Sequence, residues 1–260
     1  MIDIHSHILW CMDDGPESME ESLAMASIAA DEGISTMVAT PHCIDEKDLT
    51  GFAQRVEEKC QQLNKALDRE GIPLKVVPGA EVYMDLDILE WPGLDKLTLG
   101  NTSYILVEMP MREVPRYAED FLYHIQLKGL ISIIAHPERN RVIMEDPNLL
   151  KRFIELGSLA QINTGSITGL FGSKVQESAR ILLTHNMGHV LGTDAHSRGK
   201  RGPYMREAIE LTYKWLDQGK AEKIITTNPG KIIEGKALET DPPREYGRKR
   251  RFLGLFGKRR

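Results

Sequence analysis

The sequence predicts an α/β fold in which parallel strands close into a barrel, and three observations support that prediction. Seven short β-branched or apolar runs recur along the chain. Stretches with apolar residues at three- and four-residue spacing lie between the runs, as in amphipathic helices. A residue that can bind a metal follows nearly every run, as expected where parallel strands end on one face of a barrel.

The seven runs have the length of buried strands. Strands that alternate with helices pair in parallel, because each crossover returns the chain to the same end of the sheet. Seven such units in about 200 residues also fit an open doubly wound sheet, so the strand number alone does not separate the two folds. The runs span residues 2–5, 36–40, 74–78, 104–108, 131–135, 159–163 and 189–193.

Glycine marks several predicted helix ends. A residue with positive φ commonly stops a helix, and glycine adopts that conformation without steric cost. Apolar periodicity, for example at Leu23, Ala26 and Ala30, predicts the helices themselves. Each of four glycines precedes the next strand by a few residues: Gly33, Gly71, Gly129 and Gly157.

Length and composition favour a single α/β domain. With 260 residues, 41% of them hydrophobic, the chain can bury a substantial core. Its longest apolar stretches, such as residues 130–135, are far shorter than the roughly 20 residues that cross a bilayer, and the N-terminus carries no basic region followed by an apolar signal core. We therefore expect a cytoplasmic protein.

The C-terminal end differs in charge from the rest of the chain. Residues 244–260 contain eight Lys or Arg and one Glu, so this end carries +7 and the body −12 of the net −5. An acidic body is a poor match for a phosphate backbone, and we expect no nucleic-acid partner. The break at Asp241-Pro242-Pro243 predicts a barrel domain over residues 1–240 and a basic, aromatic tail over residues 241–260.

The tail has the composition of a docking surface. Phe252, Leu255 and Phe256 lie among its clustered Lys and Arg, as in segments that bind anionic lipid headgroups or an acidic partner. Peripheral contact with the inner face of the membrane is the resulting expectation. A disordered solubilising tail is the alternative.

The three cysteines do not predict a thiol enzyme. Cys11, Cys43 and Cys60 form no CxxC pair, and their odd number argues against a disulfide framework. Phosphatases with a cysteine nucleophile need the pattern Cys-x5-Arg, so an arginine would have to follow each candidate by six positions. Those positions hold Glu17, Leu49 and Ala66.

Residues that can bind a metal follow six of the seven runs. In a barrel of parallel strands these ends surround the axis on one face, whereas an open sheet would spread them along a line. One histidine at a strand end is more often a hydrogen-bonded core or rim residue, so the prediction depends on the coincidence of eight: His5, His7, His42, Glu81, Glu108, His136, Asp194 and His196.

The ligand types indicate a cluster of divalent ions. Imidazole and carboxylate without thiolate suit Mn, Fe, Zn or Co, and a carboxylate can bridge two ions about 3.5 to 4 Å apart. Side chains alternate along a strand, so His5 and His7 point to the same side and can bind one ion together. Asp194 and His196 repeat that spacing.

These residues lie in recognisable short motifs: Met-Ile-Asp-Ile-His-Ser-His, Met-Asp-Asp-Gly-Pro, Ala-Thr-Pro-His, Gly-Ala-Glu, Ile-Ala-His-Pro-Glu-Arg and Thr-Asp-Ala-His. The set resembles the PHP superfamily, whose members carry His-x-His after the first strand, a central Glu and a final Asp-x-His. Within it, the chain is similar over roughly residues 1–235 to the bacterial tyrosine-protein phosphatases of capsule and exopolysaccharide operons.

The resemblance implies a distorted seven-stranded, TIM-like barrel that holds three divalent ions, commonly manganese, with iron, zinc or cobalt as alternatives. By matching motifs, His5, His7, Asp194 and a bridging Glu81 would hold one ion. Glu81, Glu108 and His136 would hold the second. The third would take Asp14, His42 and His196, although Asp13-Asp14-Gly15-Pro16 alone predicts only a turn and a helix start.

The same matching implies the chemistry. Arg139 and Arg201 would act as catalytic and substrate-binding groups by donating in a fork to phosphate oxygens. A metal-bound hydroxide would attack phosphorus without a cysteine nucleophile. The resemblance also implies the partner, a phosphotyrosine protein such as a membrane-associated bacterial tyrosine kinase that controls exopolysaccharide or capsule synthesis.

Other functions fit part of the sequence. A histidinol-phosphate phosphatase or a nuclease could use the same barrel, because the ligands specify phosphoester hydrolysis better than they specify the ester. The acidic body disfavours the nuclease. A non-catalytic regulator that binds a kinase and holds structural metals is the alternative from another class.

Overall fold

The computed structural model describes residues 1–247, and it contains all seven predicted strands. Every strand pairing in this part of the chain is parallel. The predicted tail residues 248–260 lie outside the described residues. The seven strands are β1 (Ile2–Ser6), β2 (Thr36–Ala39), β4 (Lys75–Pro78), β6 (Tyr104–Glu108), β7 (Ile131–Ala135), β8 (Leu159–Asn163) and β9 (Val190–Gly192).

Two short strands are additional to the prediction: β3 (His42–Cys43) and β5 (Glu81–Tyr83). They follow β2 and β4 and divide the strands into two sheets, β1-β2-β4 and β3-β5-β6-β7-β8-β9. Pro41 lies between β2 and β3, and it interrupts the strand there because it has no N–H to donate. Gly79 lies between β4 and β5, at a close approach to β2 where a Cβ would come within 2.8 Å of Val38 Cγ1. These two breaks distort the sheet at the strand ends that carry His42 and Glu81.

The strand order returns to its start where β9 meets β1. Ser6 forms an isolated parallel bridge with Ala195. His7 N donates to Ala195 O over 2.8 Å, and Asp194 N donates to His5 O over 2.9 Å. The buried Asp3 adds a further tie, because its carboxylate accepts a hydrogen bond from Thr193 N. The carboxyl ends of β1 and β9 therefore lie side by side.

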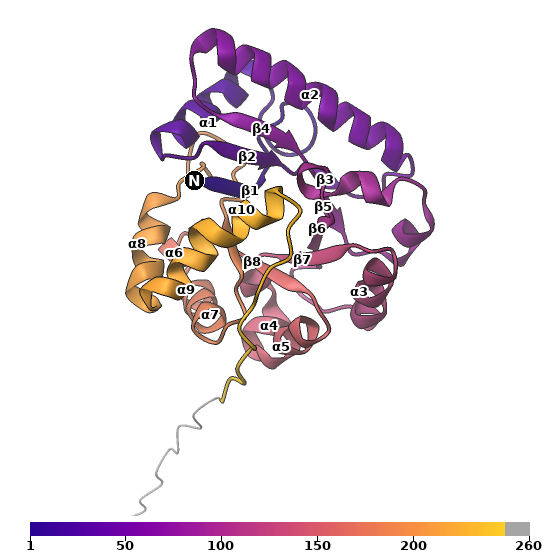
Figure 1. Ribbon diagram of the computed structural model, residues 1–260, viewed down its shortest axis with the longest axis vertical. Coiled ribbons are helices and arrows are strands. Elements are labelled where there is room, and N and C mark those ends of the chain that lie inside the picture. The colour runs from indigo at the N-terminus through magenta and orange to yellow at the C-terminus, as the bar shows by residue number, and fades with distance from the viewer. Residues whose placement is uncertain (248–260) are drawn as a thin grey trace, which may run out of the picture.

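Helices surround these strands in Figure 1. Two helices follow the first strands: α1 (Met19–Asp31) and α2 (Leu49–Glu70). Short 3-10 helices replace an α-helix between β5 and β6: η1 (Leu86–Glu90), η2 (Leu94–Leu97) and η3 (Leu99–Asn101). The remaining helical elements are α3 (Ala118–Leu127), η4 (Pro137–Arg139), α4 (Arg141–Glu145), α5 (Asn148–Glu155), α6 (Thr164–Thr168), α7 (Ser173–Thr184), α8 (Arg206–Trp215), α9 (Gln218–Glu222), the π-helix η5 (Lys223–Thr227) and α10 (Asn228–Ile233).

Local sequence explains where several helices begin and end. The Ser18 side chain accepts from Glu21 N, and Glu21 accepts from Glu17 N, so side chains satisfy free backbone donors at the start of α1. The predicted glycine stops are confirmed by positive φ angles of 89°, 67°, 77° and 99° at Gly33, Gly71, Gly129 and Gly157. These turns return the chain to the strands at the end of the barrel away from His5 and Asp194.

The apolar side chains form two clusters. The smaller contains alternate strand residues such as Ile4, Leu106 and Ile133, together with Ile232 of α10. Helix α10 therefore closes the amino end of the barrel, and Figure 1 shows it crossing in front of the strands. The larger cluster joins the strands to the outer helices. The carboxyl end is left for polar residues.

None of the helices in residues 1–247 has the length and apolar character needed to cross a membrane. After α10 the described chain continues without helix or strand to Gly247. Backbone N–H groups of this segment still bond to the body: Arg244 N donates to His185 O over 2.8 Å, and Tyr246 N donates to Asn148 Oδ1 over 2.9 Å.

Candidate metal centre

All nine residues predicted as metal ligands meet at the carboxyl end of the strands. His5, Glu81, His136 and Asp194 are buried, whereas the Asp14 side chain is 63% exposed. They come from β1, β3, β5, β6 and the loops after β1, β7 and β9. Residues from opposite ends of the sequence therefore lie within hydrogen-bonding range of one another.

The first group surrounds the imidazoles of β1. His5 Nε2 and His7 Nε2 both lie 3.3 Å from Glu81 Oε2. They lie 3.7 and 3.5 Å from Asp194 Oδ1. The two Nε2 atoms are 3.2 Å apart. These are the four residues that the sequence assigns to one ion.

The second group shares Glu81. His136 Nε2 lies 3.0 Å from Glu81 Oε1 and 3.7 Å from Glu108 Oε1. The geometry adds a residue to this group, because His42 Nδ1 lies 3.0 Å from Glu81 Oε2 and 3.7 Å from Glu108 Oε2. His42 is therefore placed between two of the predicted sets.

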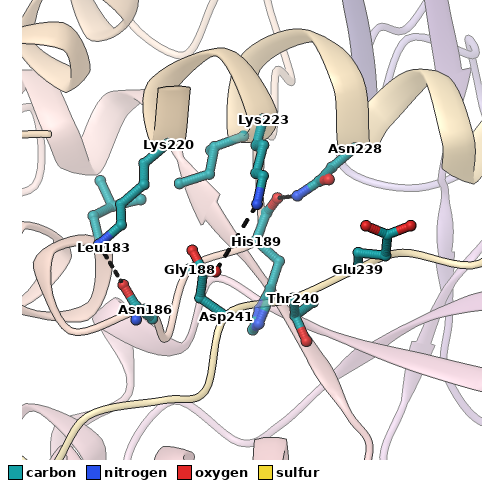
Figure 2. Close-up of a pocket in the computed structure, with 11 residues that line it drawn as sticks. Leu183, Asn186, Gly188, His189, Lys220, Lys223, Asn228, Glu239, Thr240 and Asp241 are labelled. Carbon is teal, nitrogen blue, oxygen red and sulfur yellow. Dashed lines mark hydrogen bonds and ion pairs between the residues drawn. The ribbon is translucent and has the colours of Figure 1, made fainter. Parts of the chain in front are cut away.

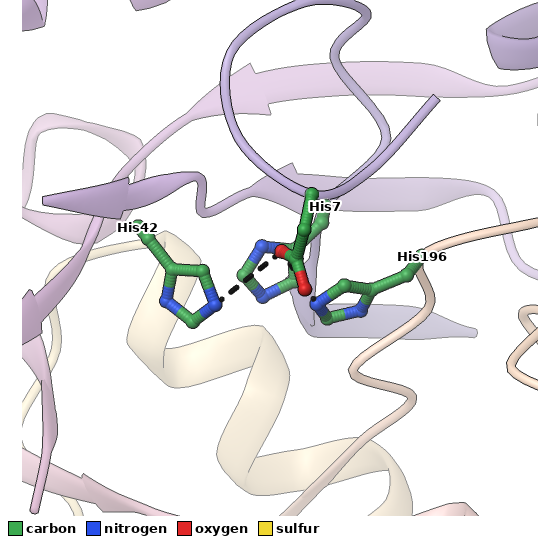
Figure 3. A group of neighbouring side chains, drawn as sticks. His7, His42 and His196 are labelled. Carbon is green, nitrogen blue, oxygen red and sulfur yellow. Dashed lines mark ion pairs between the residues drawn. The ribbon is translucent and has the colours of Figure 1, made fainter. Parts of the chain in front are cut away.

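The third group lies nearer the surface and is drawn in Figure 3. Asp14 Oδ1 lies 3.6 Å from His42 Nε2 and 3.2 Å from His196 Nε2. The His7 ring stacks on the His196 ring with 3.8 Å between centroids. One ligand atom from each of these four residues lies within 4.8 Å of the others.

Two of the residues have left-handed backbone conformations that are uncommon outside glycine. His136 has φ 32° and Asp194 has φ 52°. Both follow a strand directly or within two residues, so the left-handed turn redirects the side chain as the strand ends. Such conformations are disfavoured and persist where the surrounding structure enforces them, often at functional sites.

Hydrogen bonds to the other ring nitrogens orient three imidazoles. His7 Nδ1 pairs with Asp13 Oδ2 over 2.6 Å, and His5 Nδ1 pairs with Gln161 Oε1 over 2.9 Å. His196 Nδ1 pairs with Asp194 O over 2.8 Å. In each case the acceptor requires Nδ1–H, so Nε2 is the ring nitrogen that faces the cluster and would bind an ion after losing its proton.

Strand β8, the one predicted strand without a ligand, supplies part of this support. Gln161 Nε2 donates to Asn163 Oδ1, and Asn163 Nδ2 donates to Asp194 Oδ2, both over 2.8 Å. The buried Glu138 accepts from Asn163 N over 3.0 Å. None of these three residues was predicted from the sequence to belong to the site. Two amides at alternate positions of a fully buried strand were the available signal.

The ionisation of the centre reflects competition between burial and charge. Burial alone would lower the pKa of the histidines, but nearby carboxylates raise the pKa of His5 to about 9 and of His7 to about 10. The neighbouring imidazoles hold the pKa of Glu81 well below its usual range in spite of burial. Burial lowers the pKa of His196 to about 4, and repulsion from His7 and Arg201 adds to this effect.

The residues fit a cluster of divalent cations. Two buried atoms that face the centre, His42 Nδ1 and Glu81 Oε2, lie 3.0 Å apart, but neither forms a hydrogen bond with the described residues. Cations that took them as ligands would satisfy both atoms. The donors are imidazole nitrogen and carboxylate oxygen, and the described cysteines contribute no sulfur to the three groups. Manganese, iron, zinc and cobalt suit such donors.

Both predicted arginines lie at this centre. Arg139 Nη1 donates to Asp194 Oδ2 over 2.7 Å. Arg201 Nη2 donates to Asp194 Oδ1 over 3.2 Å, and its buried Nε has no partner among the described residues. The side chains are 19% and 35% exposed, so both guanidinium groups stand at the edge of the cluster with donors to spare.

A second polar cavity lies at the opposite end of the barrel and is separate from this centre. Figure 2 shows His189, which directly precedes β9, beside Lys220 and Lys223. The volume of this cavity is about 40 Å³. Lys223 Nζ lies 3.9 Å from Asp241 Oδ1, and Lys220 Nζ donates to Asn186 Oδ1. The nine predicted ligands do not line it.

Comparison with known proteins adds to this geometry. A family model described as "Capsular polysaccharide synthesis, CpsB/CapC" matches residues 1–234. The chain is 38% identical over 257 residues to tyrosine-protein phosphatase YwqE of Bacillus subtilis (strain 168), covering 98% of this chain and 100% of that protein. It is 32% identical over 243 residues to tyrosine-protein phosphatase CpsB of Streptococcus pneumoniae, covering 90% and 98%.

Solved structures give the same relation. One match has a TM-score of 0.88 and 37% identity and covers 95% of this chain and 100% of that chain. It belongs to a set of crystal structures of YwqE from Bacillus subtilis and CpsB from Streptococcus pneumoniae, which are described as unique metal-dependent tyrosine phosphatases. The lactonase Lmo2620 from Listeria monocytogenes, at 13% identity and a TM-score of 0.57 over 91% of this chain and 95% of that chain, shares the fold alone. These matches confirm the predicted TIM-like α/β fold class.

Proposed function

The chain belongs to the CpsB/CapC family of capsular polysaccharide synthesis proteins, and we propose from this premise that it is a metal-dependent phosphatase that removes phosphate from protein tyrosine. One observation of the molecule carries the proposal. Nine imidazole and carboxylate side chains converge at one end of the barrel, and two arginines with free donors stand beside them. That combination suits a phosphoester dianion.

We assign three ions to this centre, with manganese as the metal. His5, His7, Glu81 and Asp194 would hold the first, and Glu81, Glu108 and His136 the second. Asp14, His42 and His196 would hold the third. The distances within each set, 3.0 to 3.7 Å between neighbouring ligand atoms, support this division. The position of His42 between two sets suggests that its two nitrogens serve different ions.

The ions would supply Lewis acidity and lower the pKa of a coordinated water from 15.7 to about 7. The protein supplies the rest. Arg139 and Arg201 donate to phosphate oxygens and so stabilise charge that moves toward the leaving phenolate. Gln161 and Asp13 accept from Nδ1–H of His5 and His7, so each imidazole would offer Nε2 to an ion. Asp194 orients both guanidinium groups, because each donates to its carboxylate.

A cysteine nucleophile has no support. Cys43 lies beside His42 on β3, but burial raises the pKa of its thiol to about 12. The thiolate is the reactive form of cysteine, and it would be scarce at neutral pH. Burial also raises the pKa of Cys60. Cys43 and Cys60 therefore act as small packing residues of the core.

Two further proposals concern the protein substrate and contact with the membrane. We propose that the substrate is a membrane-associated tyrosine kinase of capsule or exopolysaccharide synthesis, and that the basic tail of residues 241–260 is an appendage to the catalytic barrel of residues 1–240. Its Lys and Arg would bind anionic headgroups and raise the local concentration of enzyme near that kinase. Equal sedimentation with anionic liposomes of the full chain and of residues 1–247 would contradict lipid binding.

One assay tests the catalytic proposal. We expect purified protein with manganese to hydrolyse a phosphotyrosine peptide, and the activity to be lost after chelation and restored by manganese. Histidinol phosphate and single-stranded DNA serve as comparison substrates. Full activity in metal-free protein would contradict the proposal, and preference for histidinol phosphate would reassign the substrate. Bound metal without hydrolysis of any ester would favour a non-catalytic regulator.

A further inference from the structure

Another cavity, distinct from the one beside His189, lies next to the metal centre. Its volume is about 220 Å³, and its lining includes both Asp194 and Arg201. The remaining wall comes from Thr193 after β9, from α6, from the loop before α7, and from the loop before α8 with Glu207 of α8, so it is built after β8 and β9 at the carboxyl end of the barrel. The cavity therefore adjoins the cluster and shares Asp194 and Arg201 with it.

Two aromatic rings form its sides. Phe171 lies against α6 at Gly165, where a Cβ would approach Phe171 Cε2 to 3.1 Å. Tyr204 lies over Gly202, where a Cβ would approach Tyr204 Cε2 to 2.6 Å. The absence of a Cβ at both glycines thus lets each ring approach the backbone closely. Tyr204 is 46% exposed, which leaves part of its ring available for contact.

The aromatic wall is connected to the proposed phosphate-binding groups. The Arg139 guanidinium carbon lies 4.3 Å from the centroid of the Phe171 ring. Arg139 also donates to Asp194, which contributes to both the cluster and the cavity. A phosphate held by Arg139 and Arg201 would therefore have an aromatic face within reach of the group that it esterifies.

We propose that this cavity binds the phenol ring of phosphotyrosine and so selects aryl over alkyl phosphates, an inference that rests on the proposed function. Leu170, Phe171 and Tyr204 supply its apolar contacts, and threonines and charged side chains such as Lys200 and Glu207 supply much of the remaining lining. Aromatic rings also favour offset or edge-to-face contact with one another. Phosphoserine and phosphothreonine carry no ring and so cannot make these contacts.

Kinetics of manganese-loaded variants test the selection. The substrates are two peptides of one sequence, with phosphotyrosine or phosphoserine at the same position. We expect Phe171→Ala and Tyr204→Ala each to reduce the ratio of their kcat/KM values about tenfold, mainly through KM for the phosphotyrosine peptide. Tyr123→Ala, which removes an exposed ring on α3, is the matched control and should leave the ratio unchanged. An unchanged ratio in both cavity variants would overturn the proposal.

Binding of non-hydrolysable analogues separates this inference from the catalytic proposal. Phenylphosphonate should bind the manganese-loaded protein about tenfold more tightly than methylphosphonate, and the double variant Phe171→Ala, Tyr204→Ala should abolish the difference. If the enzyme cleaves neither peptide but shows this preference, the phosphatase proposal fails and the ring site stands. If it cleaves the phosphotyrosine peptide but the double variant keeps the parent's preference, the ring site is wrong.

Discussion

The two ends of the barrel bury histidines under opposite electrostatic conditions. At the carboxyl end, the carboxylates outweigh burial and raise the pKa of His5 to about 9 and of His7 to about 10. At the amino end, burial without a carboxylate close enough to offset it lowers the pKa of His189 to about 4. Both environments exclude water, so burial does not explain the difference.

The difference lies in what the histidines face. Glu81 Oε2 lies within 3.3 Å of three imidazoles, those of His5, His7 and His42. His189 Nδ1 instead accepts from Ala160 N over 3.1 Å and so joins two strands. His196 lies in the same centre but outside the group around Glu81 Oε2, and burial together with repulsion from His7 and Arg201 lowers its pKa to about 4 in spite of Asp194. A ligand cluster is thus distinguished from a structural histidine by shared carboxylates.

Removing the shared carboxylate should have the largest effect. We expect Glu81→Ala to lose bound manganese and to reduce kcat/KM for a phosphotyrosine peptide by about 10³-fold or more, because Glu81 contacts the first two ligand groups. Metal content by elemental analysis and steady-state kinetics measure both. The change would also make the surroundings of His5 resemble those of His189.

Two further variants keep that experiment interpretable. Glu145→Ala removes an exposed carboxylate on α4 and should retain both metal and activity. If Glu81→Ala does not fold, as judged by circular dichroism, His136→Ala addresses the same group through its other partner. A folded Glu81→Ala protein with full metal content would show that the shared carboxylate is not what separates the two ends.

The support from β8 should have a smaller effect. Gln161→Leu removes the acceptor that holds His5 Nδ1–H, and we expect manganese affinity to fall about 10- to 100-fold. Isothermal titration calorimetry measures this change. Gln161→Glu, which restores an acceptor, should recover most of the affinity. Gln61→Leu on the exposed face of α2 is the control and should leave manganese affinity unchanged. Unchanged affinity in Gln161→Leu would mean that packing alone orients His5.

The sequence predicted the strands and the convergence of their ends because both depend on local patterns. The seven runs are confirmed as strands, and the glycine stops are confirmed by positive φ. Asp14 came from motif resemblance, since the turn that carries it has no strand periodicity. The structure places it 3.2 Å from His196, a contact between a loop near one terminus and a loop near the other.

The features that the sequence did not predict depend on tertiary contacts. The breaks that create β3 and β5 follow from Pro41 and from the close approach of Gly79 to β2, and neither residue alone specifies a second sheet. Gln161 and Asn163 gain their role only because β8 lies between β7 and β9. The aromatic cavity forms from segments after two different strands, so no single stretch of sequence indicates it.

The last prediction concerns stability at the amino end of the barrel, away from metal binding and catalysis. His189 has a pKa of about 4 in the folded protein against 6.5 in the unfolded chain, so the unfolded state binds more protons between these pH values. Its contribution to stability is therefore complete above about pH 6.5 and is lost as the pH falls toward 4. The loss amounts to at most about 3 kcal/mol. Lys220, Lys223, Glu239 and Asp241 line the same cavity and also carry charge.

His189→Asn should reduce this acid sensitivity. Asn Oδ1 can still accept from Ala160 N, but the substituted residue does not titrate. The measurement is the free energy of unfolding in urea at pH 7.5 and pH 5, with saturating manganese. The difference between variant and parent isolates His189, because both keep the same metal centre. His124→Asn on the exposed face of α3 is the control. If His189→Asn loses as much stability as the parent on acidification, desolvation does not govern this histidine, and the contrast between the two ends of the barrel would rest on the carboxylates alone.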